Sequence, residues 1–123
     1  MSASKVVIVS DYPDLRLSLE LLVTEAGLDV ATANSQQLWF PAVGSAPACC
    51  VVFDVPQGGL RAPDQIARFS VVCASYPVLA LAEAGDVSTA VLAIKQGAKD
   101  VVQKPINNRL ILERIKLISA VWQ

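Results

Sequence analysis

Short apolar runs, each bounded by polar or turn-forming residues, recur along this chain. The runs with the length of a strand lie at residues 5–10, 29–32, 49–53, 78–81 and 100–102. Most of their positions are apolar, which is typical of parallel strands buried on both faces. The segments between them have helical character, at residues 13–26, 35–43, 63–73, 87–96 and from 107 onward. This alternation of strands and helices predicts one doubly wound α/β domain.

Proline and glycine mark the ends of the expected helices. Pro13 and Pro63 suit the first turns of two of them, and Gly27 and Gly97 suit the positions just after two helices end. Pro41 lies inside the segment at 35–43 and makes that helix the weakest of the set. The first helix has an apolar stripe that should face the core, formed by Leu15, Leu19, Leu22 and Ala26.

Length and composition favour a cytoplasmic domain with a real core. The chain has 123 residues, of which 54% are hydrophobic and 17% charged. No apolar run approaches the roughly 20 residues of a membrane-spanning helix, so we expect no membrane partner. The first residues lead directly into a strand, so we expect no signal peptide.

Charge and the rare residue types exclude several kinds of chemistry. The net charge is −1, without a basic stripe, so we expect no direct nucleic-acid binding by this domain. The sequence has no histidine, which removes Ser-His-Asp and Cys-His catalysis from consideration. Cys49, Cys50 and Cys73 are expected to be buried structural thiols without disulfides.

Polar residues follow the expected strands where a ligand site would form. Asp11 follows the first strand and Asp54 the third, while Lys104 and Pro105 follow the fifth. Parallel strands end at one edge of the sheet, and open α/β sheets bind their ligands there. Two carboxylates and a lysine at that edge indicate a site for a divalent cation and an anionic phosphoryl group.

With these residues in register, the chain resembles the receiver domain of two-component response regulators. The resemblance covers residues 1–123 and is most specific over 85–105, where it is similar to regulators of the nitrogen-fixation type. It implies a flavodoxin-like fold: a five-stranded parallel sheet with strand order 2-1-3-4-5 and helices on both faces.

The resemblance also implies a function in phosphorelay signal transduction. Asp54 would accept a phosphoryl group from a sensor histidine kinase or a phosphotransfer protein, and the domain would relay the signal to an output domain or partner. Mg²⁺ would be held by Asp11, Asp54 and the backbone carbonyl of Pro56, and Lys104 would pair with Asp54. The domain would not be an enzyme beyond its own phosphorylation and dephosphorylation.

Four departures from the family pattern support an alternative. Ser10 stands where the family has an acidic residue, so Mg²⁺ should bind weakly. Ala82 replaces a Thr or Ser, Val101 replaces an aromatic residue, and the loop after Asp54 is shorter than usual. The alternative is a pseudo-receiver, a protein-interaction module that acts without phosphorylation. A nucleotide-binding domain has little support, because no strand is followed by a phosphate-binding glycine motif.

Apolar stripes on the first and last helices suggest a homodimer. One stripe of the last helix should face the sheet, formed by Ile111, Ile115, Ile118 and Trp122. A second set of apolar residues lies on the two helices, formed by Leu17, Leu21, Leu110, Leu117 and Val121. This set is either a broad core-facing surface or an apolar patch for a second copy of the chain.

Overall fold

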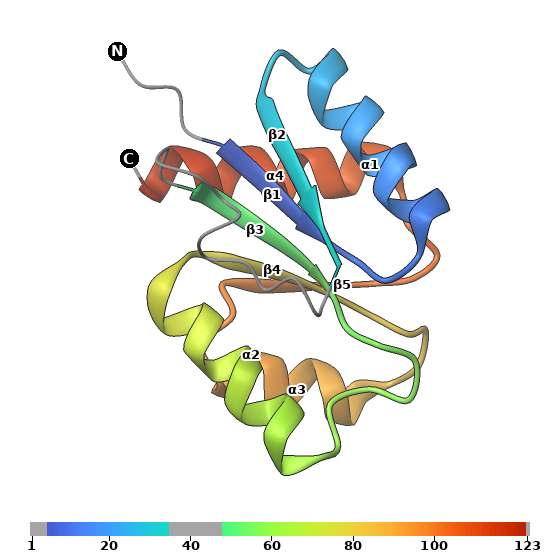
Figure 1. Ribbon diagram of the computed structural model, residues 1–123, viewed down its shortest axis with the longest axis vertical. Helices are drawn as coiled ribbons and strands as arrows, with labels where there is room; N and C mark the ends of the chain where they lie inside the picture. The colour runs from blue at the N-terminus through green and yellow to red at the C-terminus, as the bar shows by residue number, and fades with distance from the viewer. Residues whose placement is uncertain (1–4, 35–47, 123) are drawn as a thin grey trace.

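Five parallel strands form one sheet in the computed structural model, which describes residues 5–34 and 48–122. The strands are β1 (Lys5–Val9), β2 (Asp29–Ala33), β3 (Ala48–Asp54), β4 (Val78–Ala82) and β5 (Asp100–Gln103). Their order is β2-β1-β3-β4-β5, as Figure 1 shows, which confirms the predicted topology. The order reverses between β1 and β3, so the carboxyl ends of these two strands form the switch point where such sheets bind ligands.

Helices cover both faces of the sheet. They are α1 (Pro13–Glu25), α2 (Pro63–Ser75), α3 (Val87–Lys95) and α4 (Asn108–Trp122). Figure 1 shows α1 and α4 on one face and α2 and α3 on the other. The helix that the sequence predicts over residues 35–43 lies outside the described residues. No helix in the described part of the chain is long and apolar enough to cross a membrane.

Successive strand residues enter opposite cores, which explains why the strands are apolar throughout. Val7 and Val51 pack with Phe69 of α2 on one face. Val6 and Val52 pack on the other face, against α1 and α4. This two-residue alternation gives each strand two buried faces and fixes its register, because a slip by one residue would exchange the two sets.

The helix ends follow the proline and glycine signals. Pro13 occupies the first turn of α1 after Tyr12, and Pro63 does the same for α2. Gly27 and Gly97 follow the ends of α1 and α3 with positive φ angles of 86° and 113°. Glycine adopts this left-handed conformation without the steric cost that a side chain brings, so both residues stop their helices.

One prediction about burial needs correction. Cys49 and Cys50 are buried as expected, but Cys73 is only half-buried, at the edge of the core that α2 covers. All three are free thiols, and burial raises the pKa of Cys50 to about 12. Leu110 packs against the core between the sheet and α1 and α4, which agrees with the core-facing alternative for the second set.

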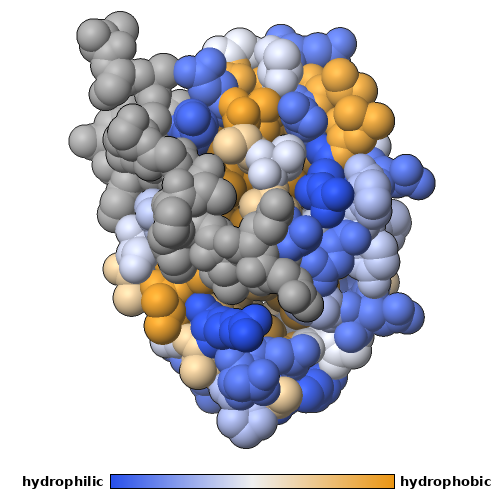
Figure 2. Space-filling view, in the orientation of Figure 1, coloured by the Kyte–Doolittle hydropathy of each residue, from blue (hydrophilic) through white to orange (hydrophobic). Residues whose placement is uncertain are grey.

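The other stripe residues fall into a buried group and an exposed group. Ile111 and Ile115 are fully buried against the sheet, and Ile118 packs beside them. Leu17 and Leu21 are each 56% exposed, and Figure 2 shows apolar surface in the region of α1. Leu117 is also exposed. The side chains of Val121 and Trp122 lie outside the described residues.

Candidate functional site

The candidate site lies at the carboxyl ends of β1, β3 and β4. Val9 of β1 pairs with Phe53 of β3, so the next residues, Ser10 and Asp54, lie beside one another. On the other side, Asp54 pairs with Leu81 of β4. The register therefore places Asp54 in the middle of the sheet edge, flanked by the ends of both neighbouring strands.

Asp54 is a buried carboxylate with a hydrogen bond at one oxygen and an ion pair at the other, Oδ1, which accepts no hydrogen bond from the described residues. It is only 4% exposed. The Ser10 hydroxyl donates to Oδ2 at 2.8 Å, and the Lys104 ammonium lies 2.8 Å from Oδ1. A buried charge is costly unless it is paired and hydrogen-bonded, and here both conditions are met. The structure thus brings Asp54 and Lys104 together as the sequence predicts.

Ser10 is held so that its single proton points at Asp54. Its hydroxyl oxygen accepts a hydrogen bond from the Tyr12 backbone N–H at 3.1 Å. Its carbonyl oxygen accepts one from the Arg16 guanidinium at 2.6 Å. Sequence reasoning treated Ser10 only as the loss of an acidic ligand, whereas the structure gives its hydroxyl a positive role as a donor to the buried carboxylate.

Lys104 is positioned by its backbone and by an aromatic ring. Its N–H donates to the carbonyl of Ala82 at 2.8 Å, and the peptide bond to Pro105 is cis. Its ammonium lies 5.5 Å from the centre of the Tyr12 ring, within the range of a cation–π contact. Sequence reasoning missed this role of Tyr12, because no local spacing relates residue 12 to residue 104.

Ala82 and Val101 leave this edge of the sheet with few polar groups. Ala82 is buried at the end of β4 and contributes a methyl group and a backbone carbonyl. Val101 is half-buried and packs against the core beneath α2 and α3. As the sequence predicts, neither position supplies a hydroxyl or an aromatic ring.

The three predicted magnesium ligands lie at or just after the carboxyl ends of β1 and β3. Asp11 is exposed, directly after the buried Ser10. The Pro56 carbonyl accepts the Gly59 N–H at 2.9 Å, which closes a turn and leaves the oxygen a second lone pair. Among the described residues, no three acidic, histidine or cysteine side chains cluster as metal ligands. Asp11, Asp54 and the Pro56 carbonyl offer oxygen donors of the kinds that Mg²⁺ takes, which commonly are one or two carboxylates beside several waters.

Comparison with a family model identifies the same architecture. Residues 6–116 match the family described as response regulator receiver domain. The transcriptional regulatory protein FixJ of Bradyrhizobium diazoefficiens is 31% identical over 118 residues, covering 96% of this chain and 57% of that protein. The transcriptional regulatory protein TdiR of Thauera aromatica is also 31% identical, covering 98% and 53%. The chain therefore spans little more than half the length of these curated relatives.

Solved structures agree with the topology. Full-length FixJ from B. japonicum superposes with a TM-score of 0.80 at 27% identity, covering the whole of this chain and 61% of that one. The receiver domain of the Francisella response regulator 1452 has the same TM-score at 16% identity and supports the fold alone. Both similarities extend across the sheet edge that carries Asp54.

Proposed function

This chain belongs to the response regulator receiver family, and we propose that Asp54 accepts a phosphoryl group from a histidine kinase or phosphotransfer protein. The observation that carries the proposal is the buried Asp54 carboxylate, with the Lys104 ammonium 2.8 Å from one oxygen at the switch point of the sheet. A carboxylate nucleophile next to a fixed cation suits phosphoryl transfer, because the cation stabilises negative charge on the incoming group.

The proposed phosphoryl transfer is a single displacement at phosphorus. An Asp54 oxygen forms a bond to phosphorus while the phosphorus–nitrogen bond of the donor phosphohistidine breaks. The electron pair of that bond stays on the imidazole nitrogen, and the product is an acyl phosphate on Asp54. Negative charge then lies on the phosphoryl oxygens, and the Lys104 ammonium, which lies beside Asp54, would pair with it.

Asp11, Asp54 and the Pro56 carbonyl are the residues that would hold Mg²⁺. When bound, the ion supplies positive charge that offsets the phosphoryl oxygens. We expect the affinity to be low, because Ser10 contributes a neutral hydroxyl where a second acidic side chain would raise the negative charge of the site. The residues of the chain itself orient and neutralise Asp54 in the resting state.

The proposed signal goes to an output domain or partner. The chain spans little more than half of FixJ and TdiR, whose names describe transcriptional regulators. We place its action in the cytoplasm, without membrane or direct nucleic-acid contact by this domain. Exposed Leu17 and Leu21 on α1 and Leu117 on α4 support a homodimer through these helices.

One observation favours a second candidate, the pseudo-receiver. Ser10 already donates a hydrogen bond to one Asp54 oxygen and Lys104 pairs by charge with the other, although Oδ1 accepts no hydrogen bond among the described residues. Ala82 adds no hydroxyl that could bind a phosphoryl group. A domain of this kind would bind its partner in a single conformation, whatever the state of a kinase.

Treatment with acetyl phosphate and Mg²⁺, followed by intact mass measurement, separates the two candidates. We expect the wild-type chain to gain one phosphoryl unit, and Asp54→Asn to gain none. Lys104→Ala should gain much less in the same time, because the cation beside the nucleophile is lost. A wild-type chain that stays unmodified, also with its kinase, would contradict the proposal and favour the pseudo-receiver.

A further inference from the structure

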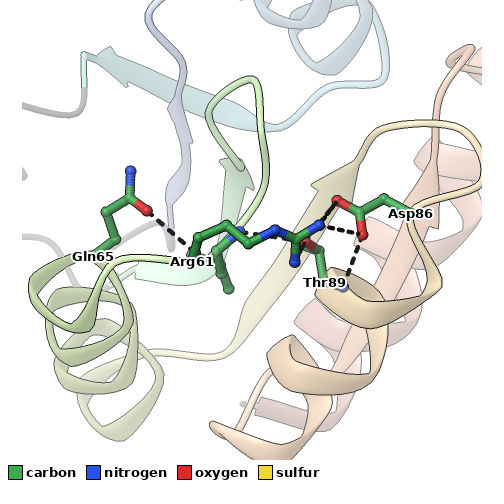
Figure 3. A network of polar contacts seen from close by, with 5 residues as sticks. Arg61, Gln65, Asp86 and Thr89 are labelled. Atoms are coloured by element: carbon green, nitrogen blue, oxygen red, sulfur yellow. Dashed lines mark hydrogen bonds and ion pairs between the residues drawn. The ribbon is translucent and has the colours of Figure 1, made fainter.

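A cluster of polar contacts fastens the loop after Asp54 to the first turn of α3. Its members, which we name the Arg61 clamp, are Gly59, Leu60, Arg61, Asp86 and Thr89, and Figure 3 shows Arg61, Asp86 and Thr89 together. Arg61 Nη2 lies 3.2 Å from Asp86 Oδ1, and Arg61 Nη1 donates to the Thr89 hydroxyl oxygen at 3.4 Å. The Leu60 backbone N–H donates to the same oxygen at 3.3 Å. Backbone and side chain of the loop are therefore both attached to the helix.

Each side of the clamp is anchored on its own element. Asp86 caps α3, since its carboxylate accepts the Thr89 backbone N–H at 3.1 Å and the Thr89 hydroxyl at 2.7 Å. Thr89 itself is fully buried. On the loop side, Gln65 of α2 accepts the backbone N–H groups of Arg61 and Ala62 at 3.3 and 3.2 Å. Figure 3 shows Arg61 reaching from this anchored segment toward Asp86.

Gly59 permits the close approach. A Cβ atom at this position would lie 2.2 Å from the Thr89 hydroxyl oxygen and 2.6 Å from Asp86 Oδ2. Its neighbour Gly58 has a similar left-handed backbone, with φ of 93° against 83°, yet a Cβ there would meet nothing within 4 Å. The two glycines therefore share their conformational requirement and differ in the contact with α3.

The loop is a short physical connection between the candidate site and α3. It begins at Val55, which is buried and donates its N–H to the Leu81 carbonyl at 3.0 Å. It ends at the clamp, where Leu60 is also buried. By contrast, β4 ends at Ala82, whose buried side chain is a methyl group without a polar atom. A change in the size or charge of the Asp54 side chain would therefore act, within a few residues of the chain, on a loop that the clamp attaches to α3.

We propose that the Arg61 clamp transmits changes at Asp54 to α3, so that the loop and the first turn of this helix respond as one unit. The inference rests on the proposed function insofar as phosphorylation is the natural change at Asp54. The response of α3 would change the surface of the domain, because α3 exposes the apolar side chains of Val87, Val91 and Ile94 one turn apart. A shift of the first turn would change what this stripe presents to a partner.

Amide hydrogen exchange of α3, followed by mass spectrometry, tests the inference with two changes at Asp54. The first change is phosphorylation by acetyl phosphate with Mg²⁺, and the second is Asp54→Asn, which needs no phosphodonor. Each is measured in the wild-type background, in Gly59→Ala, and in Gly58→Ala as the matched control. In the wild-type and Gly58→Ala backgrounds we expect exchange in residues 87–95 to change by up to about fivefold, the scale of an exposed contact.

In the Gly59→Ala background we expect α3 to lose this response, while intact mass shows the same phosphoryl uptake. Arg61→Ala should weaken the response without the backbone strain of a glycine substitution. A full response in Gly59→Ala, or none in the wild-type chain with either change, would overturn the inference. Failure of the proposed function has a different signature: no mass gain, with α3 still responding to Asp54→Asn in the clamp-intact backgrounds.

Discussion

The domain contains two carboxylate–cation pairs that look alike and differ in burial. In the candidate site, Lys104 lies 2.8 Å from Asp54, and their side chains are 20% and 1% exposed. In the clamp, Arg61 lies 3.2 Å from Asp86, and their side chains are 57% and 14% exposed. Each carboxylate also accepts a hydrogen bond from a hydroxyl group, Asp54 from Ser10 and Asp86 from Thr89. The same kind of ion pair is thus buried in the candidate site and partly exposed to solvent in the clamp.

Burial decides what each pair does. Loss of one partner of a buried pair strands the other charge away from water, which is strongly destabilising. An exposed pair is screened by solvent and contributes little to global stability. The Asp54 pair therefore ties its geometry to the stability of the fold, whereas the Asp86 pair contributes less to that stability. The role we infer for the second pair lies in connecting the loop to α3.

Removal of the Lys104 ammonium should have the largest effect. Lys104→Met keeps most of the side-chain volume but leaves the Asp54 carboxylate with Ser10 as its remaining partner. We expect the free energy of unfolding at pH 7 to fall by about 3 kcal/mol. Denaturant titration measures this loss. The double variant Asp54→Asn/Lys104→Met should recover most of it, and equal stability of Lys104→Met and wild type would show that the buried charge is not stranded.

Replacement of the Ser10 hydroxyl donor by a second carboxylate should have the second largest effect on stability. Ser10→Asp removes the hydrogen bond to Asp54 Oδ2 and sets a like charge beside it, so we expect a loss of about 2 kcal/mol without metal. Mg²⁺ should restore stability and bind more tightly than to the wild-type chain. Ser10→Ala, which loses the donor without adding charge, is the control. Unchanged Mg²⁺ affinity in Ser10→Asp would mean that this position does not face the ion.

These two variants concern the part of the molecule that the sequence predicts well. Apolar runs and proline or glycine boundaries place the described strands and helices within about two residues, because burial on both faces leaves a continuous apolar signal. Parallel topology then brings Asp54 and Lys104 to one edge. The prediction that Cys73 is buried was wrong, because apolar neighbours in the sequence do not determine which face of a helix packs against the core.

The clamp shows where sequence reasoning stops. Gly58 and Gly59 indicate a loop, but no periodicity states that Gly59 touches Thr89 or that Arg61 reaches Asp86. Such contacts depend on the path of one irregular segment and on the rotamer of a long side chain. The Tyr12 ring over Lys104 belongs to the same class. Regular elements can be predicted from repeating patterns, whereas contacts between two loops need three-dimensional coordinates.

The two glycines of the loop should differ in stability although their backbones are alike. Both Gly58→Ala and Gly59→Ala bring a side chain into the left-handed region, at a cost of about 1 kcal/mol each. Gly59→Ala must also push Thr89 and Asp86 away, so we expect a further loss of about 1–2 kcal/mol. Thermal unfolding of both variants measures the difference. Equal melting temperatures would show that the loop can move away from Thr89 and Asp86 without loss of stability.

The smallest effect should come from acid acting on the clamp. The Thr89 hydroxyl, then the Thr89 backbone N–H and the Arg61 guanidinium, hold the pKa of Asp86 below its ordinary value of 3.8. A lowered pKa means that Asp86 stabilises the fold above the ordinary value, and that this contribution disappears as the pH falls through 3.8 toward the lower folded-state pKa.

Arg61→Ala removes one of the causes of that shift, although the Thr89 contacts remain. We therefore expect a melting temperature slightly below that of the wild type at pH 7, with a difference smaller than that between the two glycine variants. The difference should narrow as the pH falls below 3.8 and through the lower folded-state pKa of Asp86, because the carboxylate then loses its charge. Arg109→Ala, which removes an exposed i,i+4 pair with Glu113 at 3.6 Å on α4, is the control for a surface arginine. A gap between wild type and Arg61→Ala that stays constant into acid would show that Arg61 acts through packing, not through the Asp86 charge.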